Sequence, residues 1–229
     1  MTTPATPQAR ASGHLYSAIA LAHRAKRCGR SWDEHLQTCH EVIQNSIRGR
    51  GGHLAILGSG LLLETPPVLF SQFSQISLLD IVHTKSVRSS VKQATNINLV
   101  ECDLTGDFLC NIDQHFDFGI SANLLSQLPL VPCEKMFKLG HTEDKILNHS
   151  YHIQQQHWLD MKKYFKHGLL FSDKEVSTLD QKGHCVEKYQ SVDPRIGIDW
   201  QEEWEWSLAP APEVYPDRSV QLTVGASSW

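Results

Sequence analysis

The feature of this sequence that most constrains its fold is an alternation of short apolar segments with amphipathic ones between residues 53 and 122. The apolar segments have the length and composition of buried strands, and the segments between them have helical patterns. Strands that follow one another through helical crossovers pair in parallel, which is the arrangement of an open α/β sheet with helices on both faces. The expected strands cover residues 53–57, 76–81, 97–102 and 116–122, and the expected helices between them cover 66–73 and 85–94.

The C-terminal part of the chain has a different pattern. A long helix is expected over residues 142–165 and leads into a strand at 168–173, whereas residues 204–210 and 220–228 alternate between apolar and polar side chains with a period of two. Such alternation predicts an antiparallel hairpin that closes one edge of the sheet. The expected fold class is therefore α/β, with an open, doubly wound, mostly parallel sheet and an antiparallel C-terminal strand.

Two helices are expected ahead of the sheet, in the segments LYSAIALAHRAKRC and SWDEHLQTCHEVIQNSI. Ser31 is placed to cap the second helix, and Glu34 three residues later completes a capping box. The residues before the helices, rich in Thr, Pro and Ala, have the composition of a flexible tail. These features divide the chain into a tail at 1–13, an N-terminal helical cap at 14–50 and a sheet domain at 51–229. The buried stripe of the second helix is expected to comprise Trp32, Leu36, Cys39, Ile43 and Ile47.

Composition and charge restrict the class of partner. The chain has 229 residues, 41% of them hydrophobic, and carries 21 basic and 25 acidic side chains for a net charge of -4. This balance gives no general attraction to nucleic acid or to anionic lipid, so neither is favoured as a partner. The six cysteines include no C-x-x-C pair, and no apolar segment has the length of a signal-peptide core or a membrane span. We expect a cytoplasmic protein with reduced thiols.

The segment HLAILGSGLLLETPP suggests a ligand site, because a glycine turn follows the first expected strand. In open α/β sheets, ligands bind beyond the carboxyl ends of the strands, and Gly58 and Gly60 would let a ligand approach the backbone. Asp80 ends the second strand twenty residues after Gly60, where a carboxylate can accept hydrogen bonds from the ribose of NAD or of S-adenosylmethionine. Asp103 follows the third strand and could accept a hydrogen bond from an adenine amino group. The alternative is that the glycines only terminate the strand.

Two prolines after the turn help to choose between these cofactors. The pyrophosphate of a dinucleotide is held by backbone amides at the start of a helix directly after the glycines. Thr65 precedes Pro66 and is biased away from helical geometry, so the expected helix starts about five residues beyond Gly60. This spacing makes a poor phosphate cradle, but it does not hinder S-adenosylmethionine, which has no phosphate.

The features that matter most are the expected terminal hairpin and the motifs AILGSGLLLE, LLDIVH, ECDLTG and FDFGISANLLSQLP. With these features the sequence resembles the class I S-adenosylmethionine-dependent methyltransferases from about Gly52 to the C-terminus. The resemblance implies that the glycine turn lies under the cofactor, that Asp80 holds the ribose and that Asp103 binds the adenine. The cofactor-binding residues that it implies are Gly58, Ser59, Gly60, Glu64, Asp80, Asp103 and Ser121.

The glycine motif departs from the family pattern at two positions. Ile56 stands where an acid usually helps to place the methionine part of the cofactor, and Leu62 stands in place of a third glycine. Glu64 is the nearest acid that could substitute. Ile56 therefore favours an alternative interpretation, in which the chain is a catalytically silent member of the fold that binds a nucleoside ligand or a partner protein.

The loop after the fourth strand faces the transferred methyl group in this family, and here that loop is SANLLSQLP. Asn123, Ser126 and Gln127 are its polar candidates for contact with an acceptor. Helix capping and turn hydrogen bonds are the structural alternative for these side chains. The N-terminal helices would cover the cofactor or form part of the acceptor pocket.

Three histidines on the long expected helix raise the question of a metal or a base. At about 100° per residue, His149 and His152 point away from the buried stripe of the helix, so the three imidazoles do not converge and no metal site is expected. His157 flanks the stripe and is a candidate general base near pH 7, with a half-buried structural histidine as the alternative. The stripe comprises Leu147, Tyr151, Trp158, Met161 and Phe165.

Together these features predict S-adenosylmethionine-dependent methyl transfer to a small-molecule or peptide acceptor, with His157 and Asn123 as the candidate catalytic residues. A nicotinamide-dependent oxidoreductase is a third interpretation. It explains Asp80, but it leaves Asp103, the late helix start and the terminal hairpin without a role.

Overall fold

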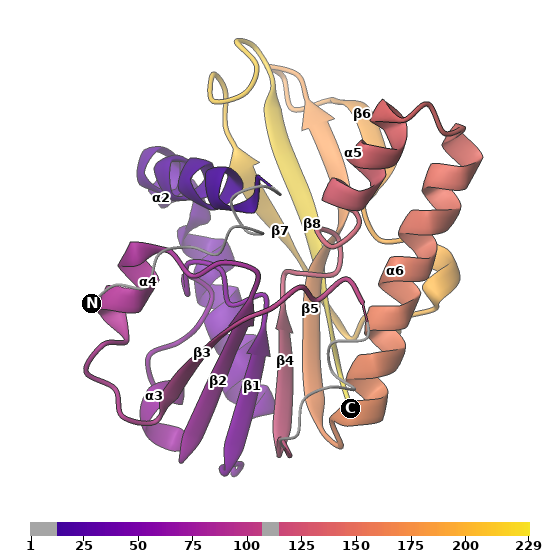
Figure 1. Ribbon diagram of the computed structural model, residues 1–229. Coiled ribbons are helices and arrows are strands. Elements are labelled where there is room, and N and C mark those ends of the chain that lie inside the picture. Colours follow the sequence, from indigo (N-terminus) through magenta and orange to yellow (C-terminus); the bar gives the residue numbers. More distant parts are fainter. Residues whose placement is uncertain (1–12, 107–114) are drawn as a thin grey trace.

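Figure 1 shows the computed structural model of the chain, which describes residues 13–106 and 115–229. Cys110 and all of the expected tail except Gly13 lie outside these ranges. The described strands form one 8-stranded sheet in the order β3-β2-β1-β4-β5-β8-β7, and β6 pairs with β5 beside this path. The strands are β1 His53–Leu57, β2 Gln75–Asp80, β3 Ile97–Glu101, β4 Phe118–Ala122, β5 Gly168–Leu179, β6 Cys185–Gln190, β7 Glu202–Ala209 and β8 Ser219–Ser228.

The sheet is parallel from β3 to β5 and antiparallel beyond. β2 and β4 pair with β1, and β3 and β5 extend the parallel part on either side. β8 runs antiparallel to both β5 and β7. Every residue of β4 is buried, because helices cover both faces, and this explains why the parallel strands have nearly continuous apolar sequences. The expected α/β fold class and its C-terminal hairpin are confirmed.

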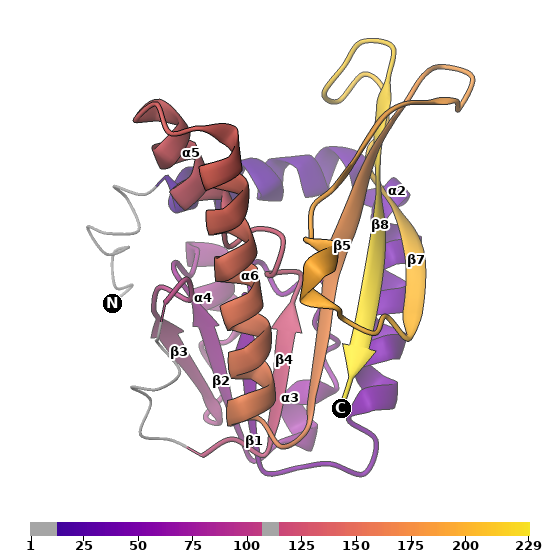
Figure 2. The same ribbon diagram turned by 90° about the vertical axis from the view of Figure 1, so that its right-hand side faces the viewer.

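The sequence did not predict the outer half of β5 or the strand β6. These two strands pair with each other and extend past the end of the parallel strands (Figure 2). All residues of β6 are exposed, so this strand lacks the apolar pattern that identifies a buried one.

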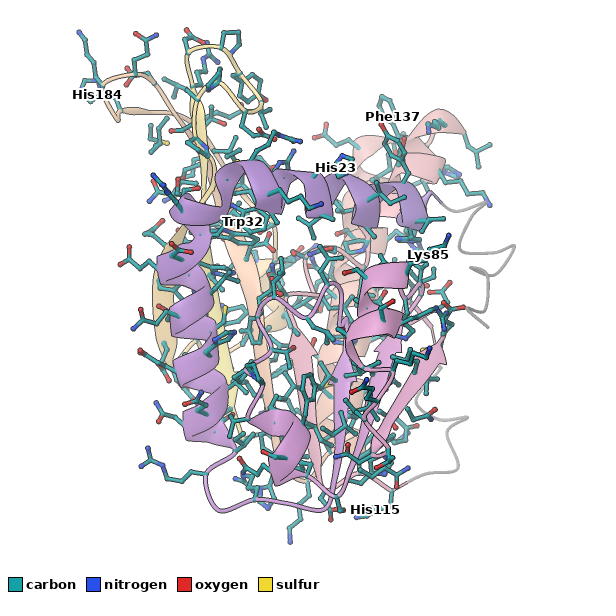
Figure 3. All side chains as sticks on the ribbon, turned by 90° about the vertical axis from the view of Figure 1, so that its left-hand side faces the viewer. His23, Trp32, Lys85, His115, Phe137 and His184 are labelled. Atoms are coloured by element: carbon teal, nitrogen blue, oxygen red, sulfur yellow. The ribbon has the colours of Figure 1, made fainter. Side chains whose placement is uncertain are left out.

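A single helix, α2 His14–Ser46, replaces the two helices expected ahead of the sheet. It bends sharply near Trp32, where its direction changes from across the sheet edge to along the sheet face (Figure 3). The expected cap at Ser31 is wrong, because its hydroxyl donates to Cys28 O at 2.7 Å and to Ser207 O at 3.3 Å. A serine that bonds back to its own helix often bends it, so Ser31 marks the bend and not a helix start.

The two halves of α2 cover different parts of the sheet. The C-terminal half packs on one face through its expected stripe, of which Trp32, Cys39, Ile43 and Ile47 are buried and Leu36 is partly buried. The N-terminal half crosses above the carboxyl ends of the parallel strands (Figures 1 and 3). Arg27 Nε donates to Glu213 Oε2, in the loop between β7 and β8, at 2.9 Å. The hydrogen bond from Arg27 is the main reason that the pKa of Glu213 falls to about 2.

The helix α6 Glu143–Tyr164 packs on the opposite face of the sheet, close to its expected bounds (Figure 2). Phe165, just after it, lies so near β4 that a Cβ at Gly119 would be 2.4 Å from its ring. Leu147 is 54% exposed, contrary to its expected place in the buried stripe. Leu147 lies in the first half of α6, which extends beyond the end of β4 (Figure 2).

The remaining helices are short. α3 Leu69–Gln72 and α4 Lys85–Ser90 fall within the segments expected to be helical, but each covers only part of its segment. α5 Leu130–Lys138 was not predicted, and it has no buried residue whose spacing would identify it. A short 3-10 helix, η2, covers Pro194–Ile196. Within the described ranges, no helix has both the length and the apolarity needed to cross a membrane.

An aromatic cluster joins α2 to β7. The ring of His35 stacks on Trp206 with centroids 4.0 Å apart, and Trp204 Nε1 donates to His35 Nδ1 at 3.0 Å. Trp32 contacts Trp206 edge-on and donates through Nε1 to Leu208 O at 2.9 Å. Trp204 and Trp206, two positions apart, face α2 together, as the alternation of a strand requires.

The buried His35 makes stability depend on pH. Burial lowers its pKa to about 3, whereas an unfolded histidine titrates near pH 6.5. Between pH 3 and pH 6.5 the unfolded chain binds a proton at His35 and the folded chain does not. The contribution of His35 to the free energy of unfolding is therefore complete above pH 6.5 and is lost as the pH falls toward 3. Urea unfolding should show that His35 accounts for a loss of about 2 kcal/mol between pH 7 and pH 5.

The matched variants are His35→Phe, which keeps a ring on Trp206, and His23→Phe on the exposed face of the same helix. His35→Phe should remove that part of the pH dependence, and His23→Phe should retain it. A wild-type pH dependence in His35→Phe would contradict a neutral, buried His35.

Candidate functional site

A tight glycine turn follows β1. Gly58 and Gly60 have φ values of 72° and 51°, in the left-handed region that glycine adopts without strain. The N–H groups of Gly58 and Ser59 both donate to Leu79 O, at 2.9 and 3.4 Å. A Cβ at Gly58 would lie 2.8 Å from Leu124 Cβ, so the turn packs directly against the chain that follows β4.

Asp80, the last residue of β2, joins this turn. Its Oδ2 accepts the N–H of Gly60 at 2.8 Å, and Oδ1 accepts that of Val82 at 3.4 Å. Burial raises the pKa of Asp80, and the hydrogen bond from Gly60 opposes that rise. A carboxylate has about four acceptor positions, so Asp80 can accept further hydrogen bonds. The structure thus places the two glycines beside Asp80, the acid whose spacing after Gly60 was noted in the sequence.

Two polar atoms beside this pair are buried and lack a partner. They are Ser59 Oγ, in the turn itself, and His83 Nδ1, three residues after Asp80. Burial lowers the pKa of His83, which is 3% exposed, and the charge of Asp80 raises it. Buried polar atoms are rarely left unpaired in a folded protein, so these two are candidates for contact with a ligand. The sequence analysis missed His83, although a polar residue in the apolar run LLDIVH is a detectable signal.

The other two predicted acids have different hydrogen-bond partners or neighbours. Asp103 is exposed, and its Oδ1 accepts the N–H and the hydroxyl of Thr105 at 2.9 and 2.6 Å, which is a local turn. Glu64 lies close to α2, where it raises the pKa of Cys39. Burial raises the pKa of Glu64 itself, and His40 opposes this. Glu64 thus lies near Cys39 and His40 of α2.

His157 and Ser121 form a buried pair between α6 and the sheet. His157 Nε2 lies 2.8 Å from Ser121 Oγ, and these residues are 5% and 0% exposed. Burial lowers the pKa of His157 to about 4, so its imidazole is neutral near pH 7. Ser121 pairs with Leu57 in the sheet, which places the pair one residue before the glycine turn.

Asn123 joins the ends of β4 and β5. It has a φ of 48°, its Oδ1 accepts the N–H of Asp173 at 2.9 Å, and its N–H donates to Phe171 O at 2.9 Å. Its carbonyl accepts Gln127 Nε2 at 2.7 Å. Turn hydrogen bonds of this kind are the structural alternative that the sequence analysis gave for the polar side chains of this loop.

Asp173 is a site residue that the sequence analysis missed. Its Oδ1 accepts the hydroxyl of Ser126 at 2.6 Å, and the residue is 9% exposed. Burial raises the pKa of Asp173 to about 6, against the effect of its hydrogen bonds. The available signal was a single acid at the end of the apolar strand GLLFSD, the same signal that identified Asp80.

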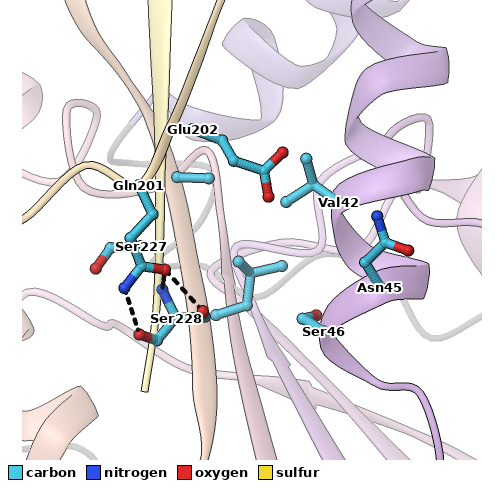
Figure 4. Close-up of a pocket in the computed structure, with 9 residues that line it drawn as sticks. Val42, Asn45, Ser46, Gln201, Glu202, Ser227 and Ser228 are labelled. Carbon is cyan, nitrogen blue, oxygen red and sulfur yellow. Dashed lines mark hydrogen bonds between the residues drawn. The ribbon is translucent and has the colours of Figure 1, made fainter.

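Two of the hollows on the described surface lie near the amino ends of the parallel strands, opposite the glycine turn. The first, of about 190 Å³, is lined by Val42 of α2 and by Gln201 and Ser228, which hydrogen-bond to each other (Figure 4). The second, of about 350 Å³, includes Arg50 and Lys166, ahead of β1 and β5.

The histidines of α6 do not converge. His149 and His152 are exposed, whereas His157 is buried under the helix. In the part of the chain that the structure describes, no group of three His, Cys, Asp or Glu side chains could hold a metal ion.

No family model and no curated protein matches this sequence. Solved structures similar to this chain include DhpI in complex with SAH, with a TM-score of 0.48, 13% identity and coverage of 93% of this chain and 94% of that one. Another is the N-methyltransferase NodS from Bradyrhizobium japonicum WM9 in complex with S-adenosylhomocysteine, with a TM-score of 0.46, 13% identity and coverage of 83% and 86%. A third is the 1,6-didemethyltoxoflavin-N1-methyltransferase from Burkholderia thailandensis, with a TM-score of 0.44, 9% identity and coverage of 99% and 93%.

The contact between the glycine turn and the chain after β4 can be tested by a matched pair of variants. Gly58→Ala should lower the free energy of unfolding by about 2–4 kcal/mol, because the new Cβ meets Leu124 in a left-handed backbone. Gly60→Ala should lower it by only about 1 kcal/mol, because the position is open and only the backbone conformation is strained. Urea unfolding measures both. Equal losses in the two variants would contradict the close contact.

Proposed function

We propose that this chain binds S-adenosylmethionine at the glycine turn and transfers its methyl group to a small-molecule or peptide acceptor. The observation that carries the proposal is the hydrogen bond between Asp80 and Gly60 at the carboxyl edge of a parallel sheet. It unites an acid suited to ribose hydroxyls with a backbone that a ligand can approach closely. The resemblance of the sequence to class I methyltransferases supports the same assignment.

The residues present fit a nucleoside with a sulfonium group. Asp80 would accept from the ribose, and the unpartnered Ser59 Oγ and His83 Nδ1 would bind polar atoms of the cofactor. Asp103 is exposed and would accept from the adenine amino group. α3 begins only at Leu69, so no helix N-terminus follows the glycines to hold a pyrophosphate. This argues for S-adenosylmethionine over NAD. Two further cofactor contacts are proposed from the sequence alone, at Glu64 and Ser121.

The chain would act mainly by alignment and by exclusion of water. The cofactor supplies a methyl group on a good leaving group, so the barrier depends on how the acceptor is held. The N-terminal half of α2 crosses the edge where the cofactor would lie and would cover it (Figure 3). Asn123 would position the loop that faces the acceptor. His157 would move a proton only through Ser121, since its Nε2 is bonded to that hydroxyl.

A second candidate is a catalytically silent protein that binds a nucleoside or a partner protein. Ile56 is 1% exposed within the core, so an apolar side chain occupies the position where the family usually has an acid. Binding without turnover distinguishes this candidate from the enzyme.

The cofactor site can be tested by calorimetry with S-adenosylmethionine, with NAD as the comparison ligand. Asp80→Ala should weaken S-adenosylmethionine binding by roughly 1.5–3 kcal/mol, the scale of a hydrogen bond to a charged group. The matched control is Asp117→Ala, because Asp117 also accepts a backbone N–H, that of His53 at 2.8 Å, but lies at the other end of the sheet. Equal affinity of wild type and Asp80→Ala, or preferential binding of NAD, would refute the assignment.

The role of His157 can be tested with isotope-labelled S-adenosylmethionine and an acceptor found by screening. If His157 and Ser121 relay a proton, His157→Gln and Ser121→Ala should each lower turnover by ~10²–10⁴ with little change in cofactor affinity. Full activity in either variant, with its fold retained, would show that the pair of His157 and Ser121 is structural and only anchors α6.

A further inference from the structure

Asp173 lies at the same edge of the sheet as the glycine turn. The parallel pairing of β4 with β5 ends at Ala122 and Phe171, and Asp173 follows two residues later. Its N–H donates to Asn123, and Leu124, the next residue, is the one that packs against Gly58. Asp173 is therefore linked to the turn through one short loop, on the β5 side where the acceptor would bind.

The carboxylate of Asp173 has only uncharged partners among the described residues. Ser126 donates to it directly, and the Ser191 hydroxyl donates to its backbone carbonyl at 2.8 Å. Tyr189 of β6 lies near enough for the charge of Asp173 to raise the pKa of the phenol.

The lysines nearest in the sequence of β5 and β6 are engaged elsewhere. Lys174 pairs with Glu203, and Lys188 pairs with Glu175, each at 2.6 Å. In the described ranges, no Lys, Arg or His forms an ion pair with Asp173, although it is nine-tenths buried. A buried carboxylate without a counter-charge is costly, and such groups are normally paired or bind a ligand.

We propose that Asp173 binds the ammonium group of the methyl acceptor, which makes the acceptor a compound with a basic amine. The inference rests on the proposed function for the identity of the reaction, but the ammonium site can be tested alone. A ligand ammonium donates to the acceptor positions that Ser126 leaves open and supplies the positive charge with which no described residue pairs Asp173. An alcohol of the same shape can donate one hydrogen bond but carries no charge, and an ionised carboxylic acid donates none and carries a negative charge.

The test uses butylamine and 2-phenylethylamine as probes, with butanol and 2-phenylethanol as uncharged isosteres. Binding is followed by protein NMR on the full chain, with and without S-adenosylhomocysteine. At least one amine should bind wild type tenfold or more tightly than its alcohol, and Asp173→Asn should remove this preference. The amide oxygen of Asn can still accept from Ser126, so the fold should be retained. Asp193→Asn is the matched control, because Asp193 is an acid that Arg195 already pairs, and it should leave the preference unchanged.

A second measurement needs no variant. With a pKa of about 6, Asp173 is largely protonated at pH 5 and ionised at pH 7.5, so amine affinity in the wild type should fall roughly tenfold at the lower pH. The alcohols should show no such change.

Two outcomes would overturn the inference: amines that bind no better than their alcohols, or an amine preference that survives in Asp173→Asn. Failure of S-adenosylhomocysteine to bind, with the amine preference intact, would instead count against the proposed function alone. Amine binding that is lost in Asp173→Asn while S-adenosylhomocysteine binding is retained supports both.

Discussion

Parallel pairing of β1 with β2 on one side and with β4 on the other is the constraint on which the rest of the structure depends. It brings the carboxyl ends of three strands to one edge, so that the glycine turn, Asp80 and the loop of Asn123 meet there. The contact of Gly58 with Leu124 and the hydrogen bond of Gly60 with Asp80 hold this edge together. Neither contact could form if the strands were shifted by one residue, because each side chain would then face the other side of the sheet.

The bent helix α2 protects this arrangement in two places. Its C-terminal half buries one face of the sheet, and the stack of His35 on Trp206 ties it to β7. Its N-terminal half crosses the carboxyl edge and is held by Arg27 and Glu213 in the loop between β7 and β8 (Figure 3).

The buried polar groups at the carboxyl edge fall into two sets. Ser59, His83 and Asp80 surround the glycine turn, whereas Asp173 and Ser126 lie beyond β4. Of these groups, Ser59 Oγ and His83 Nδ1 have no partner among the described residues, and buried polar atoms of this kind lower stability unless a ligand or water satisfies them. The division into two sets corresponds to the cofactor and the acceptor of the proposed reaction.

The sequence by itself determined the parallel strands, the terminal hairpin and the relation between Gly60 and Asp80. These depend on local periodicity and on spacing along the chain, which a single sequence displays directly. Only the tertiary structure decided that the two expected N-terminal helices are one, because packing against β7 and the bond of Ser31 to Ser207 outweigh the local capping signal.

The tertiary structure also decided the surroundings of His157 and Asp173. His157 was expected beside a buried stripe, but its pairing with Ser121 joins residues 36 positions apart in the chain. Asp173 has the same local signal as Asp80, yet Asp80 accepts a hydrogen bond from the glycine turn, whereas Asp173 is buried and forms no ion pair with any described residue. Burial and counter-charge depend on which distant segments the fold brings near, and no local pattern in the sequence encodes them.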